Sequence, residues 1–193
     1  MSVRHFIALV AVVATTLASW SPVRAESLNG VVRVNGRLQR DVVVWLEGVP
    51  ASSGMAKKAV LDQRNLTFTP HVLAVKVGTA VSMPNSDRVF HNVFSFRDGK
   101  RFDLGLYPVG KSKTVTFDQP GVSRVFCNIH PGMAAYVVAV DSDYYAVSDE
   151  AGAFSLAGVP AGTYTYHAWR AGHDVSTGRV TVQANGRLEL DLK

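Results

Sequence analysis

The sequence predicts an all-β protein, and three features of the chain lead to that fold class. Apolar residues recur at every second position in many short runs, which is the pattern of half-buried strands. The 16 glycines and 8 prolines fall mostly between those runs, where they favour turns. No amphipathic helical repeat of useful length occurs along the chain. Together these features predict antiparallel sheets that form a sandwich or a barrel.

The first 25 residues have the form of an export signal. A short basic start precedes an apolar run over residues 6–18, and a small-x-small cleavage pattern ends at Ala25. The apolar run is too short to cross a bilayer comfortably. The sequence therefore predicts a signal peptide at 1–25 and a mature chain that begins near Glu26. It predicts a periplasmic or secreted protein with no membrane span.

Two outer segments show strand alternation plainly. In residues 28–48, alternating valines precede an Asn35-Gly36 turn, which favours a tight hairpin, and a second alternating run follows it. Residues 142–193 supply about four more strands, too few to close a stable sandwich alone. The sequence therefore predicts that 26–50 and 142–193 join to form one small antiparallel β-sandwich.

The middle of the chain has the same strand character. The predicted strands there cover residues 71–77, 80–83, 92–96, 114–117, 122–126 and 134–140. Turn sequences such as Asn85-Ser86-Asp87 and Pro120-Gly121 separate them. We expect residues 51–141 to be a separate β-domain inserted into the outer module, with the small and basic run at 51–58 as its entry linker. A plain tandem of two domains is the alternative.

One loop and one distant strand together offer four metal donors. Cys127, His130 and Met133 lie within seven residues, and His91 lies thirty-six residues before the cysteine. A thiolate, two imidazoles and a thioether are the donors of a blue-copper electron-transfer centre, in which a weak axial methionine favours Cu(I). The sequence predicts one type 1 copper on these four residues. Asn92 is expected to support the site by tying the two ligand-bearing loops together.

Other interpretations of these residues fit the donor set less well. Each residue alone is more often an ordinary structural or surface residue, so only their joint occurrence favours copper. Zinc prefers a closed set of four ligands and rarely accepts a thioether. A Cys-His protease dyad has no obvious third residue to orient the base. A dinuclear copper centre bridged by cysteines is excluded because Cys127 is the only cysteine.

The segment from about Ala59 to Asp141 resembles the cupredoxins. The motifs that carry this resemblance are Phe68-Thr69-Pro70, Val77-Gly78-Thr79, Asn85 before His91-Asn92, Phe117-Asp118 before Pro120-Gly121, and the loop from Cys127 to Met133. The short loop is similar to that of amicyanin, and exported bacterial proteins described as methylamine-utilisation proteins share the longer pattern. The resemblance implies a Greek-key β-sandwich or barrel. It also implies that His91 is the buried ligand and that electrons pass through the exposed edge of His130.

The outer segments together resemble a carboxypeptidase-regulatory-like, transthyretin-like module. This second resemblance rests on the stretches Gly30–Val32, Val42–Gly48, Ser148–Phe154 and Val159–Tyr164. It implies that the copper domain interrupts a loop of the module.

Charge argues against nucleic acid as a partner. The formal net charge of +5 falls to about +3 once the leader is removed, and a nucleic-acid-binding protein would carry a dense basic stripe. Basic residues do gather near His91 in the sequence, at Arg88, Arg97, Lys100, Arg101, Lys111 and Lys113. They form either an ordinary solvated surface or a docking face for an acidic redox partner.

The sequence favours an exported, soluble type 1 copper protein that carries single electrons between redox partners and is not an enzyme. No general acid–base constellation lies near the ligand loop. The expected partners are cytochrome- or dehydrogenase-type proteins that dock near His130. A copper protein for sequestration or delivery is the alternative, and a non-metal adhesion or carbohydrate module is a third hypothesis.

Some histidine, tryptophan and methionine residues outside the predicted copper site could also have a role. His71 is expected to be a surface or inter-domain residue, with a second metal site as the alternative. His167 and Trp169 should share one strand face and pack against the neighbouring domain, with a sugar- or peptide-binding patch as the alternative. Met55 is expected in the linker and Met83 in the core.

Overall fold

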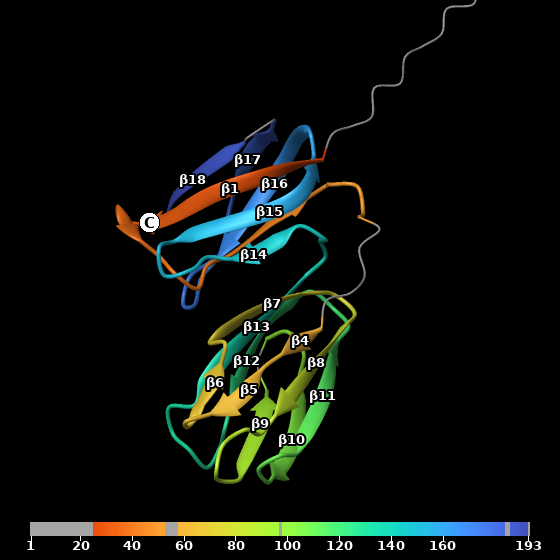
Figure 1. Ribbon diagram of the computed structural model, residues 1–193, viewed down its shortest axis with the longest axis vertical. Helices are drawn as coiled ribbons and strands as arrows, with labels where there is room; N and C mark the ends of the chain where they lie inside the picture. The colour runs from red at the N-terminus through yellow and green to blue at the C-terminus, as the bar shows by residue number, and fades with distance from the viewer. Residues whose placement is uncertain (1–24, 53–57, 97, 184–185, 193) are drawn as a thin grey trace, which may run out of the picture.

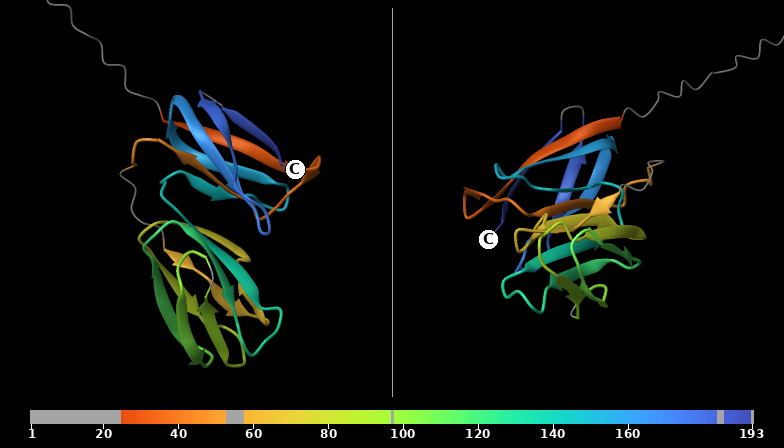
Figure 2. Two further views of the ribbon diagram at one scale, coloured as in Figure 1. Left: turned by 180° about the vertical axis from the view of Figure 1, so that it is seen from behind. Right: turned by 60° about the horizontal axis from the view of Figure 1, so that its bottom comes forward.

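The computed structural model describes residues 25–52, 58–96, 98–183 and 186–192, and strands are the only regular elements in those ranges. This confirms the predicted all-β fold class. The strands form two bodies that lie end to end, with β1, β14, β15, β16, β17 and β18 in one body and β4 to β13 in the other (Figures 1 and 2). The part of the chain that the structure describes has no helix long and apolar enough to cross a membrane.

The first body consists of two sheets. One has the order β15-β1-β18, with β2 attached to β1, and the other has the order β14-β3-β16-β17. Their bounds are β1 Ala25–Val34, β2 Arg37–Leu38, β3 Val43–Glu47, β14 Tyr145–Val147, β15 Ala153–Pro160, β16 Gly162–Trp169, β17 Ser176–Val182 and β18 Arg187–Leu192. Each sheet thus has one strand from the N-terminal segment in an interior position, β1 in the first and β3 in the second. Apolar residues from both sheets form a common core, including Leu28, Val32, Leu46, Leu156 and Leu190.

The pairing of β1 is more varied than alternation could predict. β1 runs antiparallel to β15 but parallel to β18. The same two-residue period occurs in both kinds of pair, so the sequence pattern does not distinguish them. β1 also includes Ala25, the last residue of the predicted signal peptide, which pairs with Pro160. The rest of that predicted segment, residues 1–24, lies outside the described residues.

The second body holds the middle of the chain. A five-stranded sheet has the order β10-β9-β12-β13-β7, a three-stranded sheet has the order β11-β8-β4, and β5 and β6 form a hairpin. The bounds are β4 Ala59–Val60, β5 Asp62–Arg64, β6 Thr67–Thr69, β7 Val72–Lys76, β8 Thr79–Pro84, β9 His91–Ser95, β10 Phe102–Tyr107, β11 Ser112–Phe117, β12 Gly121–Phe126 and β13 Ala134–Val140. Met83 lies in the core of this body, as predicted, beside residues such as Phe117 and Val125. Met55 lies outside the described residues.

A small apolar cluster joins the two bodies. Val43 and Trp169 of the first body pack in it with Val72, Val138 and Val140 of the second. The Trp169 ring also lies 5.3 Å from the ring of Tyr136, measured between centroids. These strand pairings and this small junction support the division into 26–50 plus 142–193 and 51–141. That division remains our proposal, and its test is given in the Discussion.

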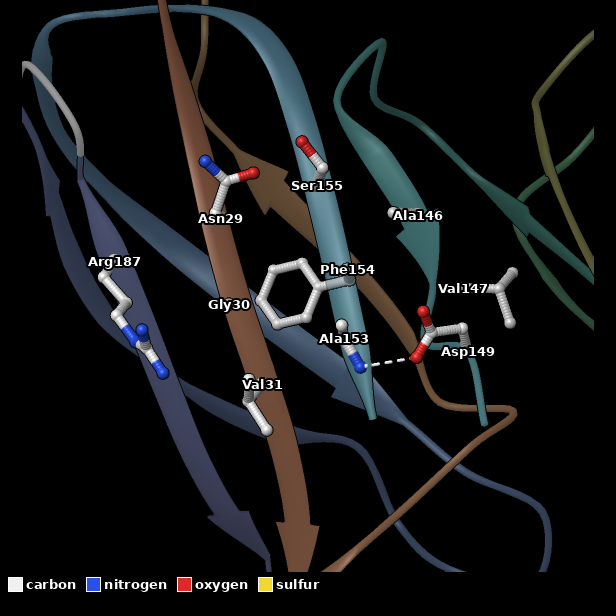
Figure 3. Close-up of a pocket in the computed structure, with 10 residues that line it drawn as sticks. All are labelled: Asn29, Gly30, Val31, Ala146, Val147, Asp149, Ala153, Phe154, Ser155 and Arg187. Carbon is white, nitrogen blue, oxygen red and sulfur yellow. Dashed lines mark hydrogen bonds between the residues drawn. The ribbon is translucent and has the colours of Figure 1, made fainter. Parts of the chain in front are cut away.

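Gly30 is a close-packed position in the first body. It lies on β1 beside a cavity of 570 Å³ between β1, β15 and β14, and the Phe154 ring lies against it (Figure 3). A β-carbon built on Gly30 would overlap both the Phe154 ring and the main-chain oxygen of Leu188. The oxygen belongs to the neighbouring strand β18, so it cannot move without breaking the pairing.

Gly30→Ala is therefore expected to destabilise the protein by about 1–3 kcal/mol, the usual range for overpacking. Urea unfolding followed by circular dichroism measures this. Asn29→Ala, at the exposed neighbour on the same strand, is the control and should change the free energy of unfolding by less than about 0.5 kcal/mol. Equal midpoints for the Gly30 variant and the parent protein would contradict the packing.

Candidate metal centre

Three possible metal-donor atoms converge at one end of the second body. Nδ1 of His91 lies 3.0 Å from Nδ1 of His130, and Sγ of Cys127 lies 3.8 Å from the former and 3.7 Å from the latter. Ligand bonds of about 2.0–2.3 Å allow donor atoms at such separations to share one ion. Among the described residues, this is the one group of three or more His, Cys, Asp or Glu side chains close enough to hold a metal.

The strand order brings these residues together. His91 is the first residue of β9, and Cys127 follows directly after the last residue of β12. The two strands are antiparallel neighbours, so the start of one lies beside the end of the other. The 36 residues between His91 and Cys127 therefore do not separate them in space.

The ligand loop between β12 and β13 is closed by its own backbone. The Cys127 amide donates to the Met133 carbonyl at 3.3 Å, and the Met133 amide donates to the His130 carbonyl at 3.2 Å. Gly132 has φ of +94°, a conformation that residues with a β-carbon rarely adopt. This backbone conformation favours glycine at the position before the methionine.

Burial divides the predicted ligands into two kinds. His91 is completely buried, Cys127 and Met133 are buried, and His130 is partly exposed. These exposures match the expectation that His91 is the inner histidine and His130 the one at the surface. Met133 belongs to the same core cluster as Cys127, and its role as the axial ligand stays a prediction.

Asn92 connects the strand that carries His91 to the ligand loop. Its Oδ1 accepts a long hydrogen bond of 3.4 Å from the amide of Asn128, the residue after Cys127. Its Nδ2 donates to Oδ1 of Asp103 on β10 at 2.9 Å. The side chain thus lies where it can hold the two ligand-bearing segments together, as the sequence predicted, while its effect on a bound metal stays a prediction.

Asp87 contacts the candidate site, although the sequence indicated only a turn there. Its Oδ2 lies 3.0 Å from Nε2 of His91 and accepts a hydrogen bond of 2.7 Å from the Leu66 amide. The hydrogen bond from the Leu66 amide, and after it those from the Arg88 amide and the His91 ring nitrogen, lower the pKa of Asp87 to about 2, although desolvation acts in the opposite direction. An ionised carboxylate only accepts, so Nε2 of His91 is the donor of this hydrogen bond, and Nδ1 is the ring nitrogen that faces Cys127 and His130.

Buried polar side chains hold the turn that carries Asp87. Nδ2 of Asn85 donates to the carbonyls of Val89 and Tyr107 at 2.9 and 3.1 Å. Gln63 is completely buried and donates to the Tyr107 hydroxyl at 2.6 Å and to the Pro84 carbonyl at 2.8 Å. Burial raises the pKa of Tyr107 to about 12, so its hydroxyl stays protonated and donates to Met83. Side-chain hydrogen bonds to the carbonyls of Pro84 and Val89 therefore hold both ends of the turn before His91.

The remaining candidates lie near the junction of the two bodies. His71 lies 3.4 Å from an oxygen of Asp41 in the first body, which favours the inter-domain interpretation. Nε2 of His167 contacts Glu47 at 2.7 Å, and its ring stacks on Trp45. Trp169 is buried at the junction, in agreement with packing against the neighbouring domain.

The basic cluster near His91 is only partly described. Lys100 pairs with Asp118 at 2.7 Å, and Lys113 donates to the Leu104 carbonyl and lies over the Tyr107 ring. Arg97 lies outside the described residues. Docking of an acidic partner on this cluster stays a prediction.

Comparison with protein families identifies both parts of the chain. Residues 55–140 match the model of copper binding proteins of the plastocyanin/azurin family. This part of the chain is therefore similar to the copper domains of that family. Residues 130–193 match the carboxypeptidase regulatory-like domain. Both predicted resemblances are thereby confirmed, and copper is the cofactor of the domain that forms the second body. The second match begins before β13, but β13 pairs with β12 and β7 of the copper domain.

Three of the solved structures that are similar to the chain are two cupredoxins and a copper-containing enzyme. A purple cupredoxin from Nitrosopumilus maritimus is 25% identical, with a TM-score of 0.40, over 43% of this chain and 100% of that one. A Cu(I) amicyanin variant is 21% identical, with a TM-score of 0.41, over 50% and 98%. The copper nitrite reductase from Thermus scotoductus is 23% identical, with a TM-score of 0.41, over 48% and 25%. No curated protein matches the chain.

Proposed function

We propose that this protein is an electron carrier in which His91, Cys127, His130 and Met133 hold one type 1 copper. The observation that supports it is the convergence of one sulfur and two ring nitrogens within 3.8 Å of one another, on segments that the fold holds in place. A soft thiolate with two imidazoles suits copper in a trigonal arrangement. When bound, the copper supplies one-electron redox chemistry.

The protein's own contribution is rigidity and exclusion of water. His91 is oriented by Asp87, and Asn92 connects its strand to the loop after Cys127. Backbone hydrogen bonds close the loop from Cys127 to Met133. A site whose ligands are held before the metal arrives changes little between two oxidation states, which favours electron exchange.

The partly exposed His130 supports electron entry and exit at this end of the domain. Its chain neighbour Ile129 is 48% exposed, and Phe90, the neighbour of His91, is 52% exposed. Exposed apolar side chains beside a site are suited to brief contacts with another protein. We propose that a cytochrome- or dehydrogenase-type redox partner docks here.

Copper sequestration or delivery is the second candidate function. The observation that favours it is the position of His130 on a partly exposed loop, since a ligand at the surface is the natural first ligand to be exchanged. The rigid support of His91 favours the carrier instead.

Two rates measured on one sample separate these functions. We expect the Cu(II) protein to be intensely coloured, its electron self-exchange to be fast, and its loss of Cu(I) to a strong chelator to be slow. Nuclear magnetic resonance line broadening in mixtures of oxidised and reduced protein measures the first rate, and stopped-flow mixing with the chelator measures the second. Rapid release of Cu(I) with slow self-exchange would instead show a delivery protein.

We place this activity in the periplasm or outside the cell, because the sequence predicts an export signal at 1–25. Mass measurement of the N-terminus after expression with an export system would test this. Cleavage after Ala25 is the expected result.

A further inference from the structure

We propose that Asp87 is a positioning residue that holds the His91 ring in one tautomer and orientation and lowers the reduction potential of the copper. The proposal rests on the copper site proposed above and deepens it. It assigns a role to a residue that binds no metal itself.

The Asp87 carboxylate accepts three directed hydrogen bonds. Oδ2 accepts from the Leu66 amide at 2.7 Å and from Nε2 of His91 at 3.0 Å, while Oδ1 accepts from the Arg88 amide at 2.8 Å. Its side chain is only 12% exposed, and the His91 side chain is not exposed at all. Two backbone amides therefore fix the acid, and the fixed acid in turn fixes the ring.

The β5–β6 hairpin has a structural role in this arrangement. Its turn residues, Asn65 and Leu66, both have positive φ, at 52° and 57°, as the tight two-residue hairpin turn requires. This turn brings the Leu66 amide to Asp87. The Ser86 amide donates to the Gln63 carbonyl at 3.0 Å, which ties the same hairpin to the turn that carries Asp87. A chain of contacts thus runs from the hairpin through Asp87 to His91.

This geometry has an electronic consequence for the site. A carboxylate on the far nitrogen of a ligating histidine orients the ring and makes the near nitrogen a stronger donor. A stronger donor and a nearby negative charge stabilise Cu(II) more than Cu(I). Cu(I) has the lower charge, so the stronger donor and the negative carboxylate stabilise it less, and the reduction potential falls.

Two substitutions separate the charge from the hydrogen bond. Asp87→Asn keeps an oxygen that can accept from His91 but removes the charge, whereas Asp87→Ala removes both. Asp118→Asn is the matched control, because it removes one acid from an exposed pair with Lys100. Dissociation constants for Cu(II) and Cu(I), together with the reduction potential, are measured for each variant.

We expect Asp87→Asn to weaken Cu(II) binding about tenfold and Asp87→Ala up to about a hundredfold, with Cu(I) binding nearly unchanged. A tenfold selective loss raises the potential by about 59 mV for a one-electron couple. The control should match the parent protein in all three quantities. Equal losses for Cu(I) and Cu(II), or no change in either, would overturn the proposal, because a purely structural role does not discriminate between oxidation states.

A second readout uses the metal-free parent protein, so it needs neither copper nor a substituted protein. In the metal-free protein, nitrogen-15 nuclear magnetic resonance should show the His91 proton on Nε2 and slow exchange of that proton with water. A proton on Nδ1 would overturn the proposal even if the variants cannot be purified. If the protein bound no copper, the proposed function would fail, whereas this tautomer would still show whether Asp87 holds the ring.

Discussion

Cys127→Ser is expected to abolish the intense colour of the Cu(II) protein and to weaken Cu(II) binding by at least about a hundredfold. The colour arises from charge transfer between a thiolate and copper, and Cys127 is the only cysteine in the chain. Serine is close to cysteine in shape, so the two histidines should keep their places. Visible absorption during a Cu(II) titration measures both effects.

The control for this substitution removes a histidine away from the site. His173→Gln changes an exposed residue in the loop between β16 and β17, and it should leave colour and affinity unchanged. Circular dichroism of the metal-free Cys127 variant should match that of the parent protein. A Cys127→Ser protein that retained the colour would rule out a type 1 site, and a parent protein without colour would favour another metal or another ligand set.

The second large effect concerns the proposed discontinuous module. A fragment of residues 142–193 should remain unfolded alone and should fold when residues 26–50 are added. Without the N-terminal segment, one sheet loses β1 from between β15 and β18, and the other loses β3 from between β14 and β16. The lost segment carries five fully buried apolar residues of the core, which are Leu28, Val32, Val42, Val44 and Leu46.

The magnitude of this loss decides the expected outcome. Burial of each such side chain contributes about 1.5–3 kcal/mol, so five contribute about 7–15 kcal/mol. The net stability of a whole domain is only about 5–15 kcal/mol. The fragment therefore cannot fold without the missing strands, and titration with a 26–50 peptide, followed by circular dichroism, should restore the β signal.

The companion fragment gives the internal control. Residues 58–141 contain every strand of the second body, together with all four predicted ligands, and should fold and bind copper alone. Independent folding of 142–193 would contradict the insertion and favour a tandem of two domains. Failure of 58–141 to fold would mean that the junction around Val72 and Trp169 is needed for stability.

Local rules explain what could be predicted about the fold. Alternation with a period of two predicted the strands around Val93, Val125 and Val137, because each presents one face to a core. The same rule missed the β5–β6 hairpin, whose Asp62–Arg64 strand is mostly polar, and it missed β10. It also left open which strand pairs with which, so the parallel pairing of β1 with β18 came only from the structure.

The sequence by itself determined the donor chemistry of this protein. A lone cysteine, a histidine three residues later and a methionine three residues after that can lie in one tight loop whatever surrounds it. His91, thirty-six residues before the cysteine, is added because a second imidazole completes the donor set of a blue-copper centre. Only the tertiary structure decided which residue contacts Nε2 of His91, the ring nitrogen that faces away from the candidate metal site. Asp87 reaches that ring because the Leu66 amide of a separate hairpin and the Arg88 amide hold its carboxylate. Asp87 is only four residues before His91, but that spacing alone does not direct the carboxylate toward the ring. The Leu66 amide, 21 residues before Asp87, meets it only in the folded chain.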